Sequence, residues 1–154
     1  MTKIFLLLLF PILSFGQISY TTQVTSGEGT DLDKLNDGDV STGWFPGWNV
    51  ADYPAKALIQ LDSEFYIHRI RFFDNSGKPK ISFYGWNGSE KVLLLEKELG
   101  SFQNWQEWEV NNQTKFELLQ VEISDIQGER PVTEIEIYGS QTVSPEPPPT
   151  PITY

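Results

Sequence analysis

Short strand-forming segments separated by turn residues recur along most of this chain, and that spacing constrains its fold more than any other feature. β-Branched and aromatic residues dominate each segment, and no stretch has the periodicity of a convincing amphipathic helix. Strands are expected at 18–24, 57–61, 65–73, 80–84, 92–98, 105–110, 115–124 and 133–138, with one helical turn at 31–35. Strands that recur about every ten residues between turns predict an all-β sandwich.

The first 16 residues are typical of a secretion signal rather than of a folded domain. Lys3 supplies the positive start, residues 4–13 form an apolar run, and small residues precede a cleavage site near Gln17. The apolar run has about half the length of a membrane-spanning helix, and no stop-transfer segment follows it. We therefore expect a secreted protein, extracellular or periplasmic, without membrane insertion.

The mature chain is acidic and contains no cysteine. Removal of residues 1–16 leaves 138 residues and takes away Lys3 but no acid, which moves the formal net charge from −10 to −11. A chain with this charge repels nucleic-acid phosphates, so no nucleic-acid partner is expected, whereas calcium and neutral partners are favoured. Without disulfides, an exported domain depends on its core, to which a bound ion would add stability.

The composition changes abruptly near residue 140. Residues 144–151 (SPEPPPTP) cannot join a sheet, because proline lacks a backbone N–H, and they predict an extended linker. The expected organisation is a signal peptide at 1–16, a single sandwich domain at 17–140 and a proline-rich linker or tail at 141–154. A stiff linker favours a further domain beyond it, such as a catalytic domain, over a free tether.

Segment 34–44 (KLNDGDVSTGW) has the composition of a loop that wraps its oxygens around a hard cation. Gly38 can adopt backbone angles closed to other residues, which lets such a loop curl. The oxygen-bearing side chains are those of Asn36, Asp37, Asp39, Ser41 and Thr42. The same residues would also form an ordinary Asp/Gly turn between two strands, and their spacing alone leaves both interpretations open. Trp44, at the end of the segment, is expected in the core.

Three motifs in this sequence resemble the galactose-binding-like superfamily. They are 36–44 (NDGDVSTGW), the strand 59–62 (IQLD) and the closing segment 134–139 (EIEIYG). Members of that superfamily include coagulation-factor C-type (discoidin) domains and many bacterial carbohydrate-binding modules. The resemblance spans residues 18–139 and implies a jelly-roll β-sandwich whose first and last strands lie near each other.

The resemblance also implies a calcium ion between the early loop and the last strand. The ligands it implies are the backbone carbonyls of Lys34, Asp39 and Thr133, the carbonyl and hydroxyl of Thr42, and the side chains of Asp37 and Glu134. Oxygen ligands with two formal carboxylates suit calcium rather than zinc or magnesium. The role of the ion would be structural, because it would pin the loop to the terminal strand and close the sandwich.

In this superfamily the ligand binds to loops at one end of the sandwich. Phe45, Trp48 and Tyr53 are therefore expected to stack on sugar rings, with Asn49 bonding to sugar hydroxyls. The alternative for each aromatic residue is to pack its loop onto the sandwich.

Further ligand candidates are His68, Arg71 and Asn75. His68, Arg69 and Arg71 lie close together on one predicted strand. The alternative for them is a partly exposed cationic strip that pairs with acids such as Glu122 and Glu136.

Signals for an enzyme are poor. The chain has one histidine and no cysteine, and it contains neither a nucleophile elbow nor a zinc-ligand spacing. Glu134 and Glu136 form an acid pair, but acids two residues apart on a strand more often mark its solvated face. We expect a non-catalytic carbohydrate-binding module that holds an attached enzyme or adhesin near a polysaccharide or glycan. The alternatives are a discoidin-type domain that binds proteins or cell surfaces, and a small glycan-active enzyme.

Overall fold

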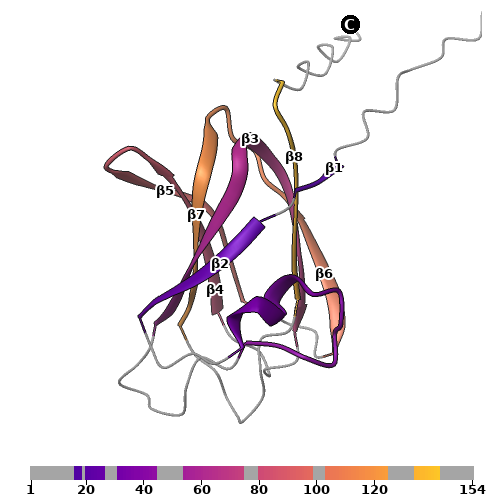
Figure 1. The fold of residues 1–154 in the computed structure, drawn as a ribbon. Coiled ribbons are helices and arrows are strands. Elements are labelled where there is room, and N and C mark those ends of the chain that lie inside the picture. Colours follow the sequence, from indigo (N-terminus) through magenta and orange to yellow (C-terminus); the bar gives the residue numbers. More distant parts are fainter. Residues whose placement is uncertain are drawn as a thin grey trace, which may run out of the picture.

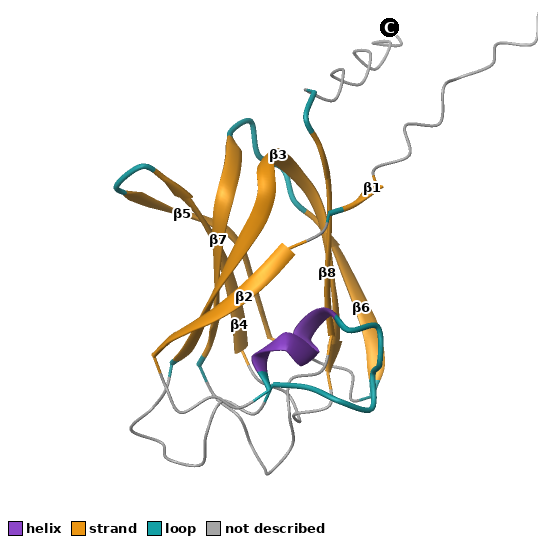
Figure 2. Cartoon of the chain, viewed as in Figure 1, coloured by secondary structure: helices purple, strands orange, loops and turns teal. Residues whose placement is uncertain are grey.

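The computed structural model describes residues 16–18, 20–26, 31–44, 54–74, 80–98, 103–124 and 134–142. Its elements are β1 (Gly16–Gln17), β2 (Tyr20–Ser26), the 3-10 helix η1 (Leu32–Asn36), β3 (Ala55–Asp74), β4 (Lys80–Asn87), β5 (Glu90–Glu98), β6 (Asn104–Glu109), β7 (Lys115–Ile123) and β8 (Glu134–Ser140) (Figure 1). The prediction of an all-β protein is confirmed, and the expected helical turn is η1 (Figure 2). Within these residues, no helix has the length and apolar character needed to span a membrane.

Strand β3 belongs to both sheets of the sandwich. Its first part, Ala55–Gln60, lies between β2 and β7, whereas its second part, Tyr66–Asp74, pairs with β8 and β6. The pairing with β7 shifts register between Gln60 and Phe65, where the strand passes from one sheet to the other. The sequence predicts two separate strands here, and the structure corrects this to one. Residues 62–64 contain neither Gly nor Pro, so the chain bends through an irregularity rather than through a turn.

The two sheets enclose one hydrophobic core. All eight described strands are joined through β3 by antiparallel pairing into one continuous hydrogen-bonded network. We call its part with the order β2–β3–β7–β4–β5 the first sheet, and its part that contains β1, β8, β3 and β6 the second sheet. Large side chains that are buried between them include Ile59, Phe72, Phe83, Phe116 and Ile137. Gly85 permits this packing, because a Cβ at that position would lie 2.4 Å from the ring of Phe116. Trp44 is fully buried, which confirms its predicted place in the core.

Many strand ends meet at one end of the sandwich, which is drawn at the bottom of Figure 1. Cross-strand pairs at this end join Ala55 and Ile81 to Ile123, Lys80 to Glu98, Asp74 to Asn104, and Phe73 to Glu134. The helix η1 lies at the same end, against the start of β8 (Figure 2). The end of β8 and the turn between β4 and β5 lie toward the opposite end.

Candidate functional site

The loop after η1 is folded around the side chains of Asp37 and Thr42. Asp37 Oδ1 accepts a hydrogen bond of 2.9 Å from the backbone N–H of Asp39, and Asp37 Oδ2 lies 2.8 Å from Thr42 Oγ1. Thr42 Oγ1 is also 3.0 Å from the carbonyl oxygen of Asp39. Gly38 has a φ of 81°, which favours glycine and lets the chain turn between the two aspartates. The Thr42 hydroxyl therefore lies between an oxygen of each aspartate.

Glu134 joins this loop to the last strand. It is the first residue of β8, it is only 3% exposed, and its Oε1 accepts a hydrogen bond of 2.7 Å from the N–H of Gly38. The carboxyl groups of Glu134 and Asp37 also lie close enough for each to shift the pKa of the other. The structure thus brings together the two carboxylates that the resemblance assigns to calcium.

The backbone N–H of Gly38 is a functional group that sequence reasoning missed. The sequence assigns this glycine only conformational freedom, whereas in the fold its N–H binds a carboxylate that is 96 residues away. A backbone donor leaves no mark in the sequence, so no local signal was available to find it.

The pKa values of the two carboxyl groups shift in opposite directions. Burial raises the pKa of Glu134 from 4.5 to about 7, the N–H of Gly38 opposes that change, and Asp37 adds to it. The pKa of Asp37 is lowered, first by the hydrogen bond from Asp39 N–H and then by the Thr42 hydroxyl. Without a cation, a proton on Glu134 is therefore the way in which this pair avoids two adjacent negative charges.

The donor set fits a calcium ion. Calcium binds oxygens at about 2.3–2.6 Å, which separates neighbouring ligands of a pentagonal bipyramid by roughly 2.8 Å. The distances of 2.8 and 3.0 Å from Thr42 Oγ1 to Asp37 and Asp39 are those of hydrogen bonds, and they place three oxygen atoms close enough to share one ion. Among the described residues no group of three or more His, Cys, Asp or Glu is placed to hold a metal, so carbonyl and hydroxyl oxygens would have to complete the set. Calcium itself stays a prediction.

The predicted calcium ligands also include Lys34 and Thr133. Lys34, whose carbonyl oxygen is expected to bind the ion, lies on η1, and its ammonium group is 3.5 Å from Asp37 Oδ2. Thr133 lies outside the described residues.

Five of the predicted sugar-binding residues lie outside the described residues, namely Phe45, Trp48, Asn49, Tyr53 and Asn75. The strand ends that border these positions show at which end of the sandwich the two segments begin and end. Ala55 follows the first segment, and Asp74 and Lys80 flank the second. All three lie at the end of the sandwich that carries Glu134 (Figure 1).

His68 lies on β3, beside the last residue of β8. Its Nε2 is 2.8 Å from Ser140 Oγ, and Ser140 is six residues along the strand from Glu134, a distance of about 20 Å. Burial lowers the pKa of His68. The structure therefore does not bring His68 together with the loop after η1.

Arg71 belongs to a separate network on the outer face of the second sheet. Its guanidinium binds Glu136 at 2.5 Å and Glu107 at 3.2 Å, and it stacks over the ring of Trp105 at 4.4 Å. The pairing with Glu136 is the alternative that the sequence left open. The other acid named in that alternative, Glu122, pairs with lysines of the first sheet instead.

Comparison with known proteins relates this chain to solved structures by its fold. No protein-family model matches the sequence, and no curated protein sequence matches it either. The family 32 carbohydrate-binding module of NanJ from Clostridium perfringens, in complex with galactose, matches with a TM-score of 0.65 and 20% identity. The match covers 77% of this chain and 93% of that one.

Two further structures give the same result. The family 32 module CpGH89CBM32-5 from Clostridium perfringens, in complex with GalNAc-β-1,3-galactose, has a TM-score of 0.64 and 15% identity, and the match covers 78% of this chain and 95% of that one. The family 32 module of AlyQ, in complex with 4,5-unsaturated mannuronic acid, has a TM-score of 0.64 and 12% identity, with 81% and 99% covered. The chain therefore has the β-sandwich fold of these modules.

Proposed function

We propose that this chain is a secreted, non-catalytic carbohydrate-binding module with a structural calcium site. The observation that carries the proposal is its fold, which matches family 32 modules over 93–99% of their own length. Those modules were solved with galactose, with GalNAc-β-1,3-galactose and with 4,5-unsaturated mannuronic acid. The proposed ligand of this chain is accordingly a polysaccharide or glycan.

The proposed sugar site lies in the loops at the end of the sandwich that carries Glu134. A calcium ion bound by Asp37, Thr42 and Glu134 would fix the loop after η1 against β8 at that end. Trp44 is fully buried just before segment 45–53 and would anchor its start. The proposed sugar contacts are Phe45, Trp48, Asn49, Tyr53 and Asn75.

We propose that the chain is not catalytic because three of its glutamates already bind groups within the protein. Glu134 is bound by the N–H of Gly38, and Glu107 and Glu136 are both held by Arg71. A carboxyl group committed to a structural contact is poorly placed to act on a glycosidic bond. The module would instead hold an attached enzyme or adhesin, joined through the proline-rich segment, close to a glycan surface and so raise its effective concentration.

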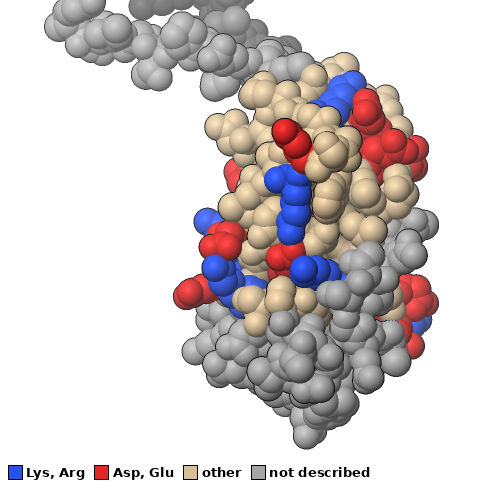
Figure 3. Space-filling model, turned by 90° about the vertical axis from the view of Figure 1, so that its left-hand side faces the viewer, with Lys and Arg blue, Asp and Glu red and all other residues tan. Residues whose placement is uncertain are grey.

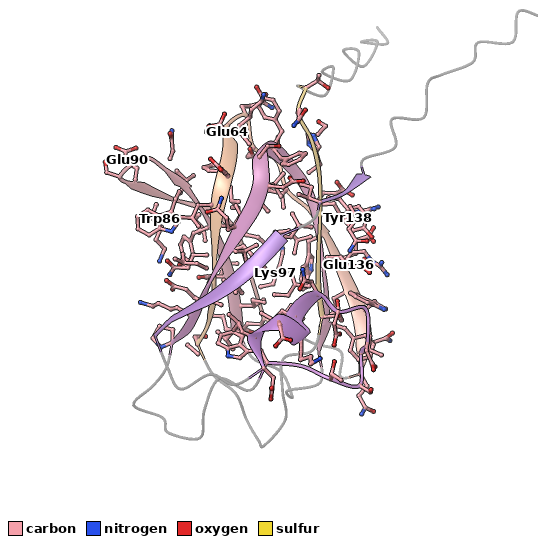
Figure 4. The ribbon with its side chains drawn as sticks, in the orientation of Figure 1. Glu64, Trp86, Glu90, Lys97, Glu136 and Tyr138 are labelled. Atoms are coloured by element: carbon pink, nitrogen blue, oxygen red, sulfur yellow. The ribbon has the colours of Figure 1, made fainter. Side chains whose placement is uncertain are left out.

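A glycan array probed with the protein tests the proposal. We expect binding to one class of glycan, and a loss of about tenfold in affinity in Trp48→Ala, because stacking on the sugar ring is removed. Trp86→Ala is the matched control. It removes a tryptophan beside the β4–β5 turn, away from the proposed site (Figure 4), and should leave binding unchanged.

The outcomes separate the three functions. Failure to bind any glycan, together with binding to a cell-surface protein, would favour a discoidin-type interaction domain. Release of reducing ends from a bound polysaccharide would show that the chain is an enzyme.

A further inference from the structure

Strand β5 forms an outer edge of the first sheet. It pairs with β4 on one side, and no strand within the described residues pairs with its other side. The β4–β5 hairpin reaches away from the body of the sandwich (Figure 1). The middle of β5 is apolar, and Val92 and Leu93 are 38% and 53% exposed. A free edge with exposed apolar side chains is suited to pair with another strand.

An irregularity in β5 decides which of its side chains share a face. Phe83 pairs with Leu95 and Tyr84 pairs with Leu93, so Leu94 is an extra residue in the strand. The face toward the core carries Glu90, Val92, Leu95 and Lys97, which pair with Asn87, Gly85, Phe83 and Ile81. The outer face carries Lys91, Leu93, Glu96 and Glu98, which pair with Trp86, Tyr84, Ser82 and Lys80.

We propose that β5 pairs antiparallel with β5 of a second copy of this chain. Residues 90–97 read EKVLLLEK, and their charges are complementary to those of the same strand in reverse. The pairs, each formed twice by symmetry, are Glu90 with Lys97, Lys91 with Glu96, and Val92 with Leu95, while Leu93 and Leu94 lie at the centre of the contact. In this register two opposite-charge pairs flank each end of an apolar centre.

The extra residue Leu94 makes this register possible. Antiparallel pairing places side chains of the same face opposite each other, and a shift of one residue reverses the faces. In a regular strand, residues 90 and 97 would point to opposite faces. Because Leu94 is inserted between them, Glu90 and Lys97 both lie on the core side, and Lys91 and Glu96 both lie on the outer side.

The charges of these pairs differ in whether they already have a partner among the described residues of the chain: those on the outer face do, and those on the core side do not. On the outer face, Lys91 binds Glu122 and Glu96 binds Lys80 at 2.8 Å, and basic and acidic side chains lie side by side on this part of the molecule (Figure 3). Glu90 and Lys97 are exposed, lie at well-separated positions on the strand (Figure 4), and make no ion pair with another described residue. Self-complementarity is what identifies a second copy, rather than an unrelated protein, as the partner.

Sedimentation velocity at increasing protein concentration, from about 10 μM to about 1 mM, tests this pairing. We expect a monomer–dimer equilibrium that shifts to dimer with concentration and back toward monomer with added salt. Glu90→Lys or Lys97→Glu places like charges opposite each other twice in the dimer, so each should weaken association by about tenfold or more. The double variant Glu90→Lys/Lys97→Glu restores opposite charges and should return most of the affinity.

Leu93→Lys tests the apolar centre of the contact. This side chain is 53% exposed in the single copy, so the melting temperature of the monomer should not change, whereas dimerisation should be lost. A protein that stays monomeric at the highest concentration would overturn the proposal. A dimer that persists in Leu93→Lys, or a double charge swap that restores nothing, would place the contact elsewhere.

Discussion

Two clusters of charged side chains lie along β8, and they differ in how their charges are balanced. At the start of the strand, the buried carboxyl group of Glu134 lies against that of Asp37. Two residues further on, Glu136 binds the guanidinium of Arg71 at 2.5 Å and accepts a hydrogen bond of 2.6 Å from the Tyr138 hydroxyl (Figure 4). The first cluster places two acids together with a single lysine, Lys34, whose ammonium group is 3.5 Å from Asp37 Oδ2, whereas the second places its acids against arginines.

The second cluster needs no added group. Arg71 also contacts Glu107, and Arg69 lies 4.1 Å from the centre of the Tyr138 ring, so each cation has a partner. The first cluster has an excess of acid in a buried place, which either a proton or a cation must offset. The raised pKa of Glu134 is the consequence of that excess. One strand thus carries a self-sufficient network beside a site that favours an ion.

The largest expected effect is a fall in the stability of the calcium-free protein as the pH rises. The folded state holds a proton on Glu134 up to a pKa of about 7, whereas the reference pKa for the unfolded chain is 4.5. The folded state therefore binds more protons between these values, so the free energy of unfolding falls as the pH rises through this window. The fall is at most about 3 kcal/mol. Urea unfolding near pH 5 and near pH 8, with a chelator present, measures it.

Two glutamine variants on the same strand sharpen this test. Glu134→Gln keeps the size of the side chain but cannot titrate, so it should remove the decline in stability. Glu136→Gln should retain it, because Glu134 is intact. If the decline persists in Glu134→Gln, another group titrates, and the contrast between the two clusters is wrong.

Calcium should raise the free energy of unfolding, by slightly less than the rise in pH lowers it. Binding at about 100 times the dissociation constant stabilises the fold by about 2.7 kcal/mol, so chelation should lower the melting temperature by several degrees and by about 10 °C at most. Calcium needs an ionised Glu134, so the effect should be larger near pH 8 than near pH 6. Thermal melts with calcium and with chelator measure it.

Asp37→Ala is the decisive control for that experiment. Without this carboxylate the calcium effect should disappear, whereas the effect should persist in Glu136→Gln. An unchanged melt of the original protein after chelation, or a calcium effect retained in Asp37→Ala, would contradict the site.

The strands of this fold can be predicted from the sequence because their side chains alternate. Ile135 and Ile137 are fully buried, whereas Glu136 and Tyr138 face arginines on the outer side. Alternation is a local property that the sequence displays directly. The continuity of β3 cannot be predicted in this way. No residue type marks the point after Gln60 where the strand leaves one sheet and enters the other.

The candidate site could be predicted only in part. Asp37, Gly38 and Thr42 lie within six residues, so the composition of one segment indicates a loop rich in oxygen ligands. The contact with Glu134 depends on how the chain ends meet, and only the resemblance connected the two. The expectation that the acids of 134 and 136 mark a solvated face is wrong for Glu134, because its carboxyl group is buried against the loop after η1.

The smallest expected effect is that of Arg71→Met in the second cluster. The variant loses two partly exposed ion pairs and the stacking on Trp105 but keeps part of the packing, so the free energy of unfolding should fall by about 1 kcal/mol. Because this cluster is balanced by its own charges, the loss should be equal with calcium and with chelator. Chemical unfolding under both conditions measures it. A difference above about 0.5 kcal/mol between the two conditions would mean that the clusters are coupled along β8 and do not act separately.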